Sequence, residues 1–273
     1  MKSLPKSQVL RFTEKAIHLV RRATSRYSSK FPKHRYTLPQ HVVLLCLKAR
    51  KNTTYRGLFD KLIEMPRIRR ALGSAELPTP STLCKAFNQL GMARWSVILT
   101  LSAMLLPTSG IVGVDPSGFD GSHASKHYTK RAKLTIQRLK ATLLVNAKVN
   151  AIPDLHLTTT RKHDSQIAPS LIKRNLESID ILLGDKGYDD QKIRRLARQQ
   201  KVRPLIKHRE FTLLHKVWNA QLNADLYGQW SQSETVNSTL RRKNGAFVRS
   251  RRWWKQFCEL TIACLVHNVG RSL

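Results

Sequence analysis

Acidic residues are scarce in this sequence, which has 17 aspartates and glutamates against 49 lysines and arginines among its 273 residues. The formal net charge of +32 repels itself unless a polyanion lies nearby, so nucleic acid is the partner that the composition favours. Residues 1–110 hold 20 basic and 4 acidic residues, and the remainder holds 29 and 13, so each part carries +16. We therefore expect both parts to face the same polyanion. A merely cationic soluble protein of the ribosomal type is the alternative that charge leaves open.

Long hydrophobic runs and paired cysteines are also lacking. The longest apolar run, residues 95–106, holds about a dozen residues and is too short to span a bilayer. The opening MKSLPKSQVLRF contains no apolar segment of the kind that signal peptides have. The four cysteines form no C-x-x-C pair and have no histidine at a zinc-ligand spacing: Cys46, Cys84, Cys258 and Cys264. We therefore expect a reduced, cytoplasmic protein with no membrane partner and no structural zinc.

Helical periodicity dominates residues 1–106, which we interpret as one helical DNA-binding region. Within residues 66–91, a short helical segment, a tight break and a second helical segment follow one another, with polar side chains on the second. This order is compatible with a helix-turn-helix that reads DNA. A plain helical bundle explains the same pattern equally well, so both interpretations stay open.

From residue 107 onward the pattern changes to short apolar runs that alternate with helical segments. Five runs have the composition of β-strands: residues 111–115, 141–150, 154–160, 179–185 and 202–206. The second and third alternate well enough to be antiparallel neighbours, with a turn expected at residues 152–154. Strands that alternate with helices predict an α/β layer with a parallel part. We therefore expect residues 107–273 to form a second domain of the α/β class.

Three of the scarce acids occupy positions that suggest chemistry. Asp115 and Asp185 each end a short apolar run, and open α/β sheets build their sites at the C-terminal ends of strands. Glu234 lies on a helical face that mixes polar and apolar residues, although a surface acid explains it as well when it is taken alone. Together the three would repel one another without a metal. Mg²⁺ prefers carboxylate oxygens, and two such ions about 4 Å apart neutralise the charge at a reacting phosphodiester.

These segments resemble the motifs of DDE transposases of the IS4/IS5-like insertion-sequence group. The segment GVDPSGF is similar to the first motif and matches its aspartate to Asp115. LLGDKGYDD is similar to the second motif and matches its aspartate to Asp185. The third motif reads Tyr, two residues, Arg, three residues, Glu, six residues, Lys, and Tyr227 and Glu234 fall in register with it. The three acids stand in order with 69 and 48 residues between them, which makes the resemblance specific.

The resemblance implies a fold, an activity and partners. The fold would be an RNase H-like mixed sheet flanked by helices in residues 107–273, preceded by an all-helical region. The activity would be cleavage of DNA at the ends of an insertion sequence and strand transfer through the freed 3′-hydroxyl. Asp115, Asp185 and Glu234 would hold two Mg²⁺ ions, with Mn²⁺ as the alternative metal. The partners would be terminal inverted repeats, target DNA and a second copy of the chain in a homodimer, at the nucleoid.

Two alternatives to a transposase remain. One is an RNase H-like nuclease that cleaves without joining, and the other is an inactive or regulatory DNA-binding derivative. The third motif departs from its pattern in two places, because Trp230 occupies the arginine position and Arg241 the lysine position. An indole can stack on an unpaired base, and a guanidinium can still contact phosphate. We expect DNA contacts from nine residues: Tyr227, Trp230, Arg241, Arg242, Lys243, Lys126, Lys130, Arg131 and Lys186.

Other polar residues near the second motif have structural interpretations. Asp189 and Asp190 are predicted to be the N-cap and a first-turn acid of the helix that follows. For Asp164, in the segment KHD, a hydrogen bond across the strand-to-helix turn is favoured over metal ligation. Lys186 and Tyr188 are expected to line the wall of the site.

Overall fold

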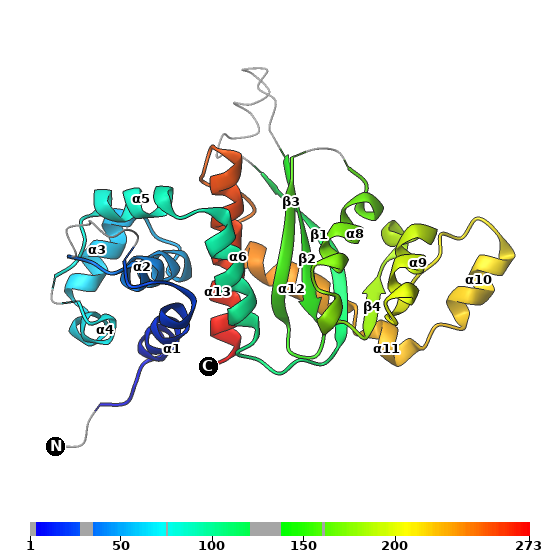
Figure 1. Cartoon of the computed structure of the whole chain (residues 1–273), viewed down its shortest axis with the longest axis horizontal. Helices are drawn as coiled ribbons and strands as arrows, with labels where there is room; N and C mark the ends of the chain where they lie inside the picture. Colours follow the sequence, from blue (N-terminus) through cyan, green and yellow to red (C-terminus); the bar gives the residue numbers. More distant parts are fainter. Residues whose placement is uncertain (1–3, 28–34, 75, 121–137, 160–161) are drawn as a thin grey trace. The chain divides into compact units, whose positions relative to one another are not determined.

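The computed structural model describes residues 4–27, 35–74, 76–120, 138–159 and 162–273 (Figure 1). The chain divides into two compact units, one of Met1–Leu105 with Phe257–Leu273 and one of Leu106–Gln256. The division near residue 106 lies where the sequence pattern changes. The C-terminal segment differs from the prediction, because Phe257–Leu273 belongs to the compact unit of the N-terminal helices. Two polar contacts show this packing: Asn268 Nδ2 donates to Ser102 Oγ at 2.9 Å, and Lys15 donates to the carbonyl of Ser272.

The first unit is all helical, and local sequence explains where its helices begin and end. Thr37 and Gln40 form a capping box at the start of α2, and α4 ends at Gly73, which has a left-handed φ of 64°. The helices are α1 (Gln8–Ala23), α2 (Leu38–Arg50), α3 (Tyr55–Ile63), α4 (Pro66–Leu72), α5 (Pro80–Gln89), α6 (Met92–Ala103) and α13 (Trp253–Arg271), whose last part belongs here. In the predicted helix-turn-helix segment, α4 packs on α1 and α3, whereas α5 packs on α2 and α3.

The second unit is built on a five-stranded mixed sheet in the order β3-β2-β1-β4-β5. Strands β1, β2 and β3 are antiparallel neighbours, and β4 and β5 run parallel to β1. This sheet with helices on both faces confirms the predicted RNase H-like class. The strands are β1 (Ile111–Asp120), β2 (Arg138–Asn146), β3 (Ala151–Thr158), β4 (Ile181–Gly184) and β5 (Arg203–Ile206).

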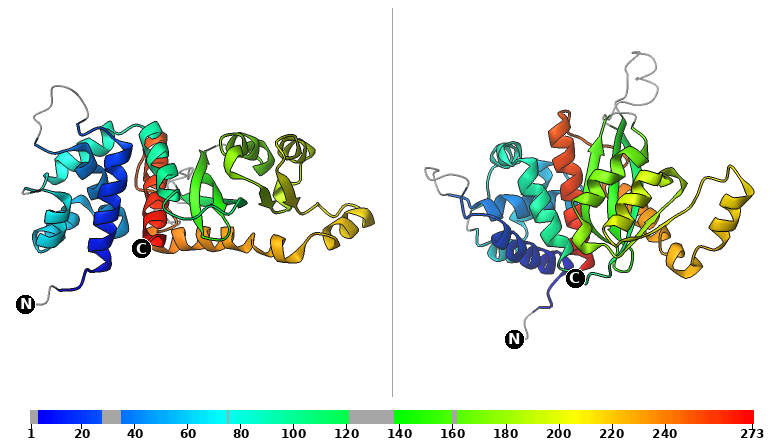
Figure 2. Two further views of the ribbon diagram at one scale, coloured as in Figure 1. Left: turned by 60° about the horizontal axis from the view of Figure 1, so that its bottom comes forward. Right: turned by 45° about the vertical axis from the view of Figure 1, so that its right-hand side comes forward.

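The two faces of the sheet carry different helices. Helices α8 (Asp164–Lys173) and α9 (Gln191–Gln199) cover one face, where Val112, Leu182 and Ile206 form part of the larger core cluster. Helix α12 (Ser231–Asn244) lies on the opposite side of the sheet (Figure 2). Because successive strand residues point to opposite faces, Ile111 and Leu183 face the α12 side, where Trp230 packs against the same cluster.

The hairpin between β2 and β3 turns earlier than the sequence predicted. The turn lies at residues 147–150, where Asn150 has a φ of 58°, and not at residues 152–154. The prediction was wrong because Pro153, at the centre of the expected turn, lies within β3. That strand forms an edge of the sheet, where a missing backbone N–H is tolerated.

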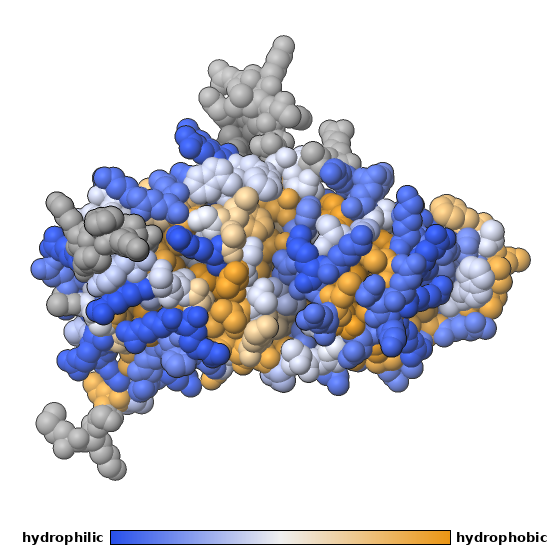
Figure 3. All heavy atoms as spheres, in the orientation of Figure 1, coloured by the Kyte–Doolittle hydropathy of each residue, from blue (hydrophilic) through white to orange (hydrophobic). Residues whose placement is uncertain are grey.

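The segment between β5 and α12 contains two short helices that the sequence analysis did not predict, α10 (Leu213–Ala220) and α11 (Ala224–Gly228). Hydrophobic surface gathers over α10 in the space-filling view (Figure 3), where Phe211 and Leu213 are both 79% exposed. Short 3₁₀ turns lie at Leu176–Ser178 and Lys186–Tyr188. Among the described residues, no helix has both the length and the apolar character that crossing a membrane requires.

Candidate active site

The strand register brings the two predicted catalytic aspartates to the same edge of the sheet. Strands β1 and β4 are parallel neighbours, and Gly113 lies opposite Leu183. Two residues further along each strand direction are Asp115 and Asp185, which therefore lie side by side where β4 ends. Both side chains point to the face of the sheet that α12 covers, since alternate residues of a strand share a face. Asp185 follows β4 as predicted, whereas Asp115 lies within β1, because that strand continues to Asp120 and does not end at residue 115 as predicted.

Helix α12 lies close against β1 at this edge. A Cβ atom added at Gly113 would lie 2.1 Å from Ser233 Oγ, so the approach of the helix requires a glycine in the strand. Trp230 Nε1 donates to the carbonyl of Val114 at 3.2 Å, just before the helix begins. Asn237, one turn beyond Ser233, lies on the same helical face. The helix is therefore anchored on β1 on both sides of Glu234.

Asn237 contacts the first aspartate directly. Its Nδ2 donates to Asp115 Oδ2 at 2.6 Å, and its own side chain is 4% exposed. Asn237 Oδ1 is buried and has no hydrogen-bond partner among the described residues. Glu234 precedes Asn237 by three residues and is exposed. The helix thus presents one carboxylate to solvent at this edge and one amide to Asp115.

The electrostatics of the edge reflect several acids close together. Burial raises the pKa of Asp115 to about 6, the hydrogen bond from Asn237 opposes this, and the negative charges of Glu234, Asp185 and Asp164 add to it. Burial also raises the pKa of Tyr227 to about 12, with a further contribution from the charges of Asp185 and Glu234. The three predicted catalytic acids therefore influence the same small region.

The donors in this region have the chemistry that Mg²⁺ prefers, but they do not surround one point. Asp115, Asp185 and Glu234 offer carboxylate oxygens, and the unpartnered Asn237 Oδ1 is a further oxygen. In the part of the chain that the structure describes, no three histidine, cysteine, aspartate or glutamate side chains are grouped closely enough to hold a metal ion. The residues thus fit a divalent cation by donor type and by charge. Side-chain rotation would be needed to bring the oxygens together.

Asp164 is a fourth acid beside this edge. A Cβ atom at Gly187 would lie 3.0 Å from Asp185 Oδ1 and 3.6 Å from Asp164 Oδ2, so both carboxylates approach the same backbone position. Asp164 Oδ1 lies 2.7 Å from Lys140 Nζ. An ion pair to β2 therefore takes the place of the hydrogen bond that the sequence analysis favoured.

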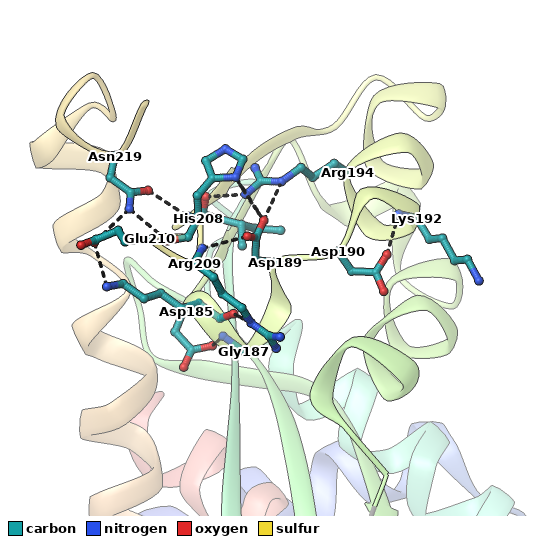
Figure 4. Close-up of polar contacts among 12 residues, drawn as sticks. Asp185, Gly187, Asp189, Asp190, Lys192, Arg194, His208, Arg209, Glu210 and Asn219 are labelled. Atoms are coloured by element: carbon teal, nitrogen blue, oxygen red, sulfur yellow. Dashed lines mark hydrogen bonds and ion pairs between the residues drawn. The ribbon is translucent and has the colours of Figure 1, made fainter. Parts of the chain in front are cut away.

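Asp189 belongs to a separate, fully paired cluster (Figure 4). Its Oδ1 accepts from Arg194 Nη2 at 2.8 Å, and its Oδ2 accepts from the backbone N–H of Arg209 at 2.8 Å. Arg194, whose side chain is 5% exposed, also donates to the carbonyl of Ile206. Burial acts to raise the pKa of Asp189, but these hydrogen bonds and the charge of Arg194 outweigh it, so that the pKa is lowered.

The predicted cap of α9 is wrong by one residue. Asp190 is the N-cap, because its side chain accepts from the backbone N–H of Lys192 at 2.7 Å. Asp189 turns instead to the buried guanidinium of Arg194, which no local pattern announces. Tyr188, expected in the wall of the site, is fully buried in the core beneath α8 and α9.

The predicted DNA-contacting residues occupy different settings. The ring of Trp230 stacks on the ring of Tyr227, with centroids 6.4 Å apart. Its Nε1 donates to the carbonyl of Val114 and is therefore not available for DNA. Lys186 forms an ion pair with Glu210 at 2.8 Å. Three basic residues are exposed in the last turn of α12: Arg241, Arg242 and Lys243. Three others lie outside the described residues: Lys126, Lys130 and Arg131.

Two residues at this edge were not predicted. Asn237 could have been found from its spacing, since three residues after Glu234 is nearly one helical turn. Lys207 follows the apolar end of β5 just as Asp185 follows that of β4. Its position directly after the strand was the available signal, although a lysine there is common in so basic a chain.

An RNase H-like sheet with one acid within β1, one just after β4 and one on the facing helix defines a class of enzymes that act on nucleic acid phosphodiesters. Residues 107–269, more than half of the chain, match the family described as Transposase DDE domain. The chain therefore belongs to this family, which confirms the resemblance at the family level.

Solved structures of two transposase complexes are similar to the chain. One is the cryo-EM structure of the piggyBac transposase synaptic complex with hairpin DNA, with 10% identity over 96% of this chain and 70% of that chain and a TM-score of 0.47. The other is the Mos1 transposase paired-end complex with left transposon end, with 11% identity over 81% of each chain and a TM-score of 0.28. No curated protein matches the chain.

Proposed function

We propose that this chain is the transposase of an insertion sequence, which cleaves DNA at the ends of the element and joins the freed 3′-hydroxyl to target DNA. The observation that supports this best is the strand register that sets Asp115 beside Asp185. Helix α12 adds Glu234 at the same edge, and the family match spans all three residues. A fold with one acid alone at this edge would support DNA binding but not phosphodiester chemistry.

In this proposal Asp115, Asp185 and Glu234 hold the metal. Bound Mg²⁺, or Mn²⁺ in its place, supplies neutralisation of charge on the reacting phosphate and on the attacking and leaving oxygens. The protein's own residues supply position. Asn237 fixes the Asp115 carboxylate through its amide, and Trp230 ties the start of α12 to β1.

Binding of DNA is assigned to the basic residues outside this group of acids. The exposed cations at the end of α12 would contact phosphates, and the same role is proposed for the basic residues of 126–131. The helices of residues 1–106 would dock on the element end, either as a helix-turn-helix or as a bundle. The active complex is proposed to be a homodimer that holds two ends, as the family resemblance implies.

The proposal is tested with labelled DNA that carries the sequences flanking the coding region, a target plasmid and Mg²⁺. We expect cleavage at the element ends and a labelled product joined to the plasmid, and neither product in EDTA. Clean cleavage without joined product would identify a nuclease. Retained DNA binding with no cleavage in Mg²⁺ or Mn²⁺ would identify an inactive or regulatory derivative.

A further inference from the structure

Lys207 lies at the end of a third parallel strand, next to the two aspartates. Strands β4 and β5 pair in parallel with Gly184 opposite Ile206. The next residue after each strand is therefore Asp185 beside Lys207. The backbone N–H of Lys207 donates to the carbonyl of Gly184 at 3.3 Å, which continues the pairing. Asp115 within β1, Asp185 just after β4 and Lys207 just after β5 therefore lie on three neighbouring strands and share the face that α12 covers.

Aromatic rings hold the ammonium of Lys207 in place. Its Nζ lies 4.8 Å from the ring centroid of Tyr227, within the range of a cation–π contact. The Tyr227 ring stacks on Trp230, with an interplanar angle of 15°, and Trp230 is hydrogen-bonded to β1. The lysine is thus fixed through two rings to the strand that carries Asp115.

The ammonium of Lys207 keeps its hydrogen-bond donors free. Two nearby lysines are neutralised by carboxylates, Lys140 by Asp164 and Lys186 by Glu210. Among the described residues, no carboxylate lies within 4.0 Å of Lys207 Nζ, and no hydrogen bond from this atom is found. A ring face offers no acceptor oxygen, so all three N–H donors remain for a ligand.

We propose that the Lys207 ammonium binds a phosphate group of the DNA strand that lies at the carboxylate edge, the edge of the sheet that carries Asp115 and Asp185. The inference rests on the proposed function, since it takes DNA as the ligand. An edge that carries several carboxylates repels a phosphate backbone, and a cation beside them on the next strand offsets that repulsion. The aromatic support fixes the cation without consuming its charge, which a carboxylate partner would do.

The test is the salt dependence of DNA binding by the full chain and by Lys207→Gln, measured with labelled duplex DNA. Each phosphate contact contributes about 0.9 to the slope of log K against log salt concentration. We expect the slope of Lys207→Gln to fall by about that amount. The titrations are run in EDTA and again in Ca²⁺, which takes the same oxygen ligands as Mg²⁺, so neither depends on cleavage or joining.

Lys173→Gln is the matched control, because it removes the same charge at the opposite end of α8 from Asp164, roughly 14 Å along the helix. Lys207→Arg should keep the wild-type slope, since it keeps the positive charge. Equal slopes for Lys207→Gln and Lys173→Gln in both buffers would overturn the proposal. A changed slope without any cleavage product in Mg²⁺ would instead count against the proposed function alone.

The aromatic support has its own pair of variants. Tyr227→Phe keeps the ring and is expected to keep the slope, whereas Tyr227→Leu removes the ring and should lower the slope as Lys207→Gln does. Thermal unfolding of each variant shows that the fold is retained. If Tyr227→Leu, once folded, binds DNA with the wild-type slope, the ring does not position the lysine and the proposal fails.

Discussion

Two aspartates in one short loop, Asp185 and Asp189, have opposite surroundings. Asp185 lies beside Asp115, and no lysine or arginine approaches its carboxylate within 4.0 Å among the described residues. The backbone N–H of Gly187 donates to Asp185 Oδ1 at 2.9 Å. Asp189, four residues later, is bound by Arg194 and by the backbone of Arg209. In a chain with nearly three basic residues for each acid, it is the absence of a basic partner at Asp185 that is unusual.

The difference shows how a functional acid can be recognised in a basic protein. Burial and neighbouring acids raise the pKa of Asp115, whereas hydrogen bonds and an arginine lower that of Asp189. An arrangement that disfavours charge costs stability and is retained where a ligand such as a metal offsets the cost. An arrangement that favours charge stabilises the fold. We therefore propose a catalytic role for Asp115, with Asp185 beside it in the strand register, and a structural role for Asp189.

The largest predicted effect is on activity at the carboxylate edge. Asp115→Asn and Asp185→Asn should each lower the rate of strand cleavage by at least about a thousandfold, because each removes several kcal/mol of charge stabilisation. Cleavage of labelled end DNA in Mg²⁺ measures this.

The same two variants should not destabilise the fold. Asparagine at position 115 relieves the burial of a charge and the repulsion from Asp185, so we expect the melting temperature in EDTA to stay the same or rise. A fall of the melting temperature together with activity would show that Asp115 is structural. In that case the contrast with Asp189 would disappear.

The second prediction concerns the paired cluster. Asp189→Ala should lower the free energy of unfolding by roughly 3 kcal/mol, because it leaves the buried Arg194 guanidinium without its carboxylate. Asp190→Ala is the matched control, and it should cost about 1 kcal/mol through loss of the α9 cap. Urea denaturation measures both. Equal effects at the two positions would mean that the Arg194 pair contributes no more than an ordinary helix cap.

The third prediction concerns the amide that joins α12 to Asp115. Asn237→Ala should lower the cleavage rate by roughly tenfold to a hundredfold, since a hydrogen bond to a charged group contributes about 1.5–3 kcal/mol. Because Asn237 is a positioning residue, the variant should also need a higher Mg²⁺ concentration for half-maximal activity. Asn237→Gln, which keeps an amide, should recover part of the loss. An unchanged Mg²⁺ requirement would show that the residue acts on folding alone.

The strands and the two aspartates were accessible to sequence analysis because their signal is local, although β1 continues past Asp115 to Asp120. Short apolar runs mark β1 and β4, and an acid that follows each run can be read directly from the sequence. The roles of Asn237 and Lys207 depend on how α12 is rotated against β1 and on the register of β5. The spacing of Asn237 from Glu234 and the strand-end position of Lys207 are weak local signals, since an amide or a lysine at such a position is common in any chain.

Other misses arose where tertiary packing decides which partner a residue or helix takes. Asp189 resembles a helix cap locally, and its pairing with Arg194 appears once α9 is folded against β5. The last part of α13 follows the sheet domain in sequence but packs with the N-terminal helices, because an apolar helix face does not specify which core it joins. Helices α10 and α11 were missed since they are short and α10 leaves its apolar residues exposed.

The smallest predicted effect is the contribution of Asp189 to the dependence of stability on pH. The pKa of Asp189 is lowered in the folded state, so Asp189 binds a proton less readily in the folded chain than in the unfolded chain. An aspartate of the unfolded chain has a pKa of about 3.9. The stabilisation is therefore complete at neutral pH and is lost as the pH falls below about 4. The difference in unfolding free energy between the wild type and Asp189→Asn should stay constant from neutral pH to about 5 and then shrink. A difference that persists at lower pH would show that the Asp189→Asn variant loses packing, not charge, and that the contrast between the two aspartates is not electrostatic.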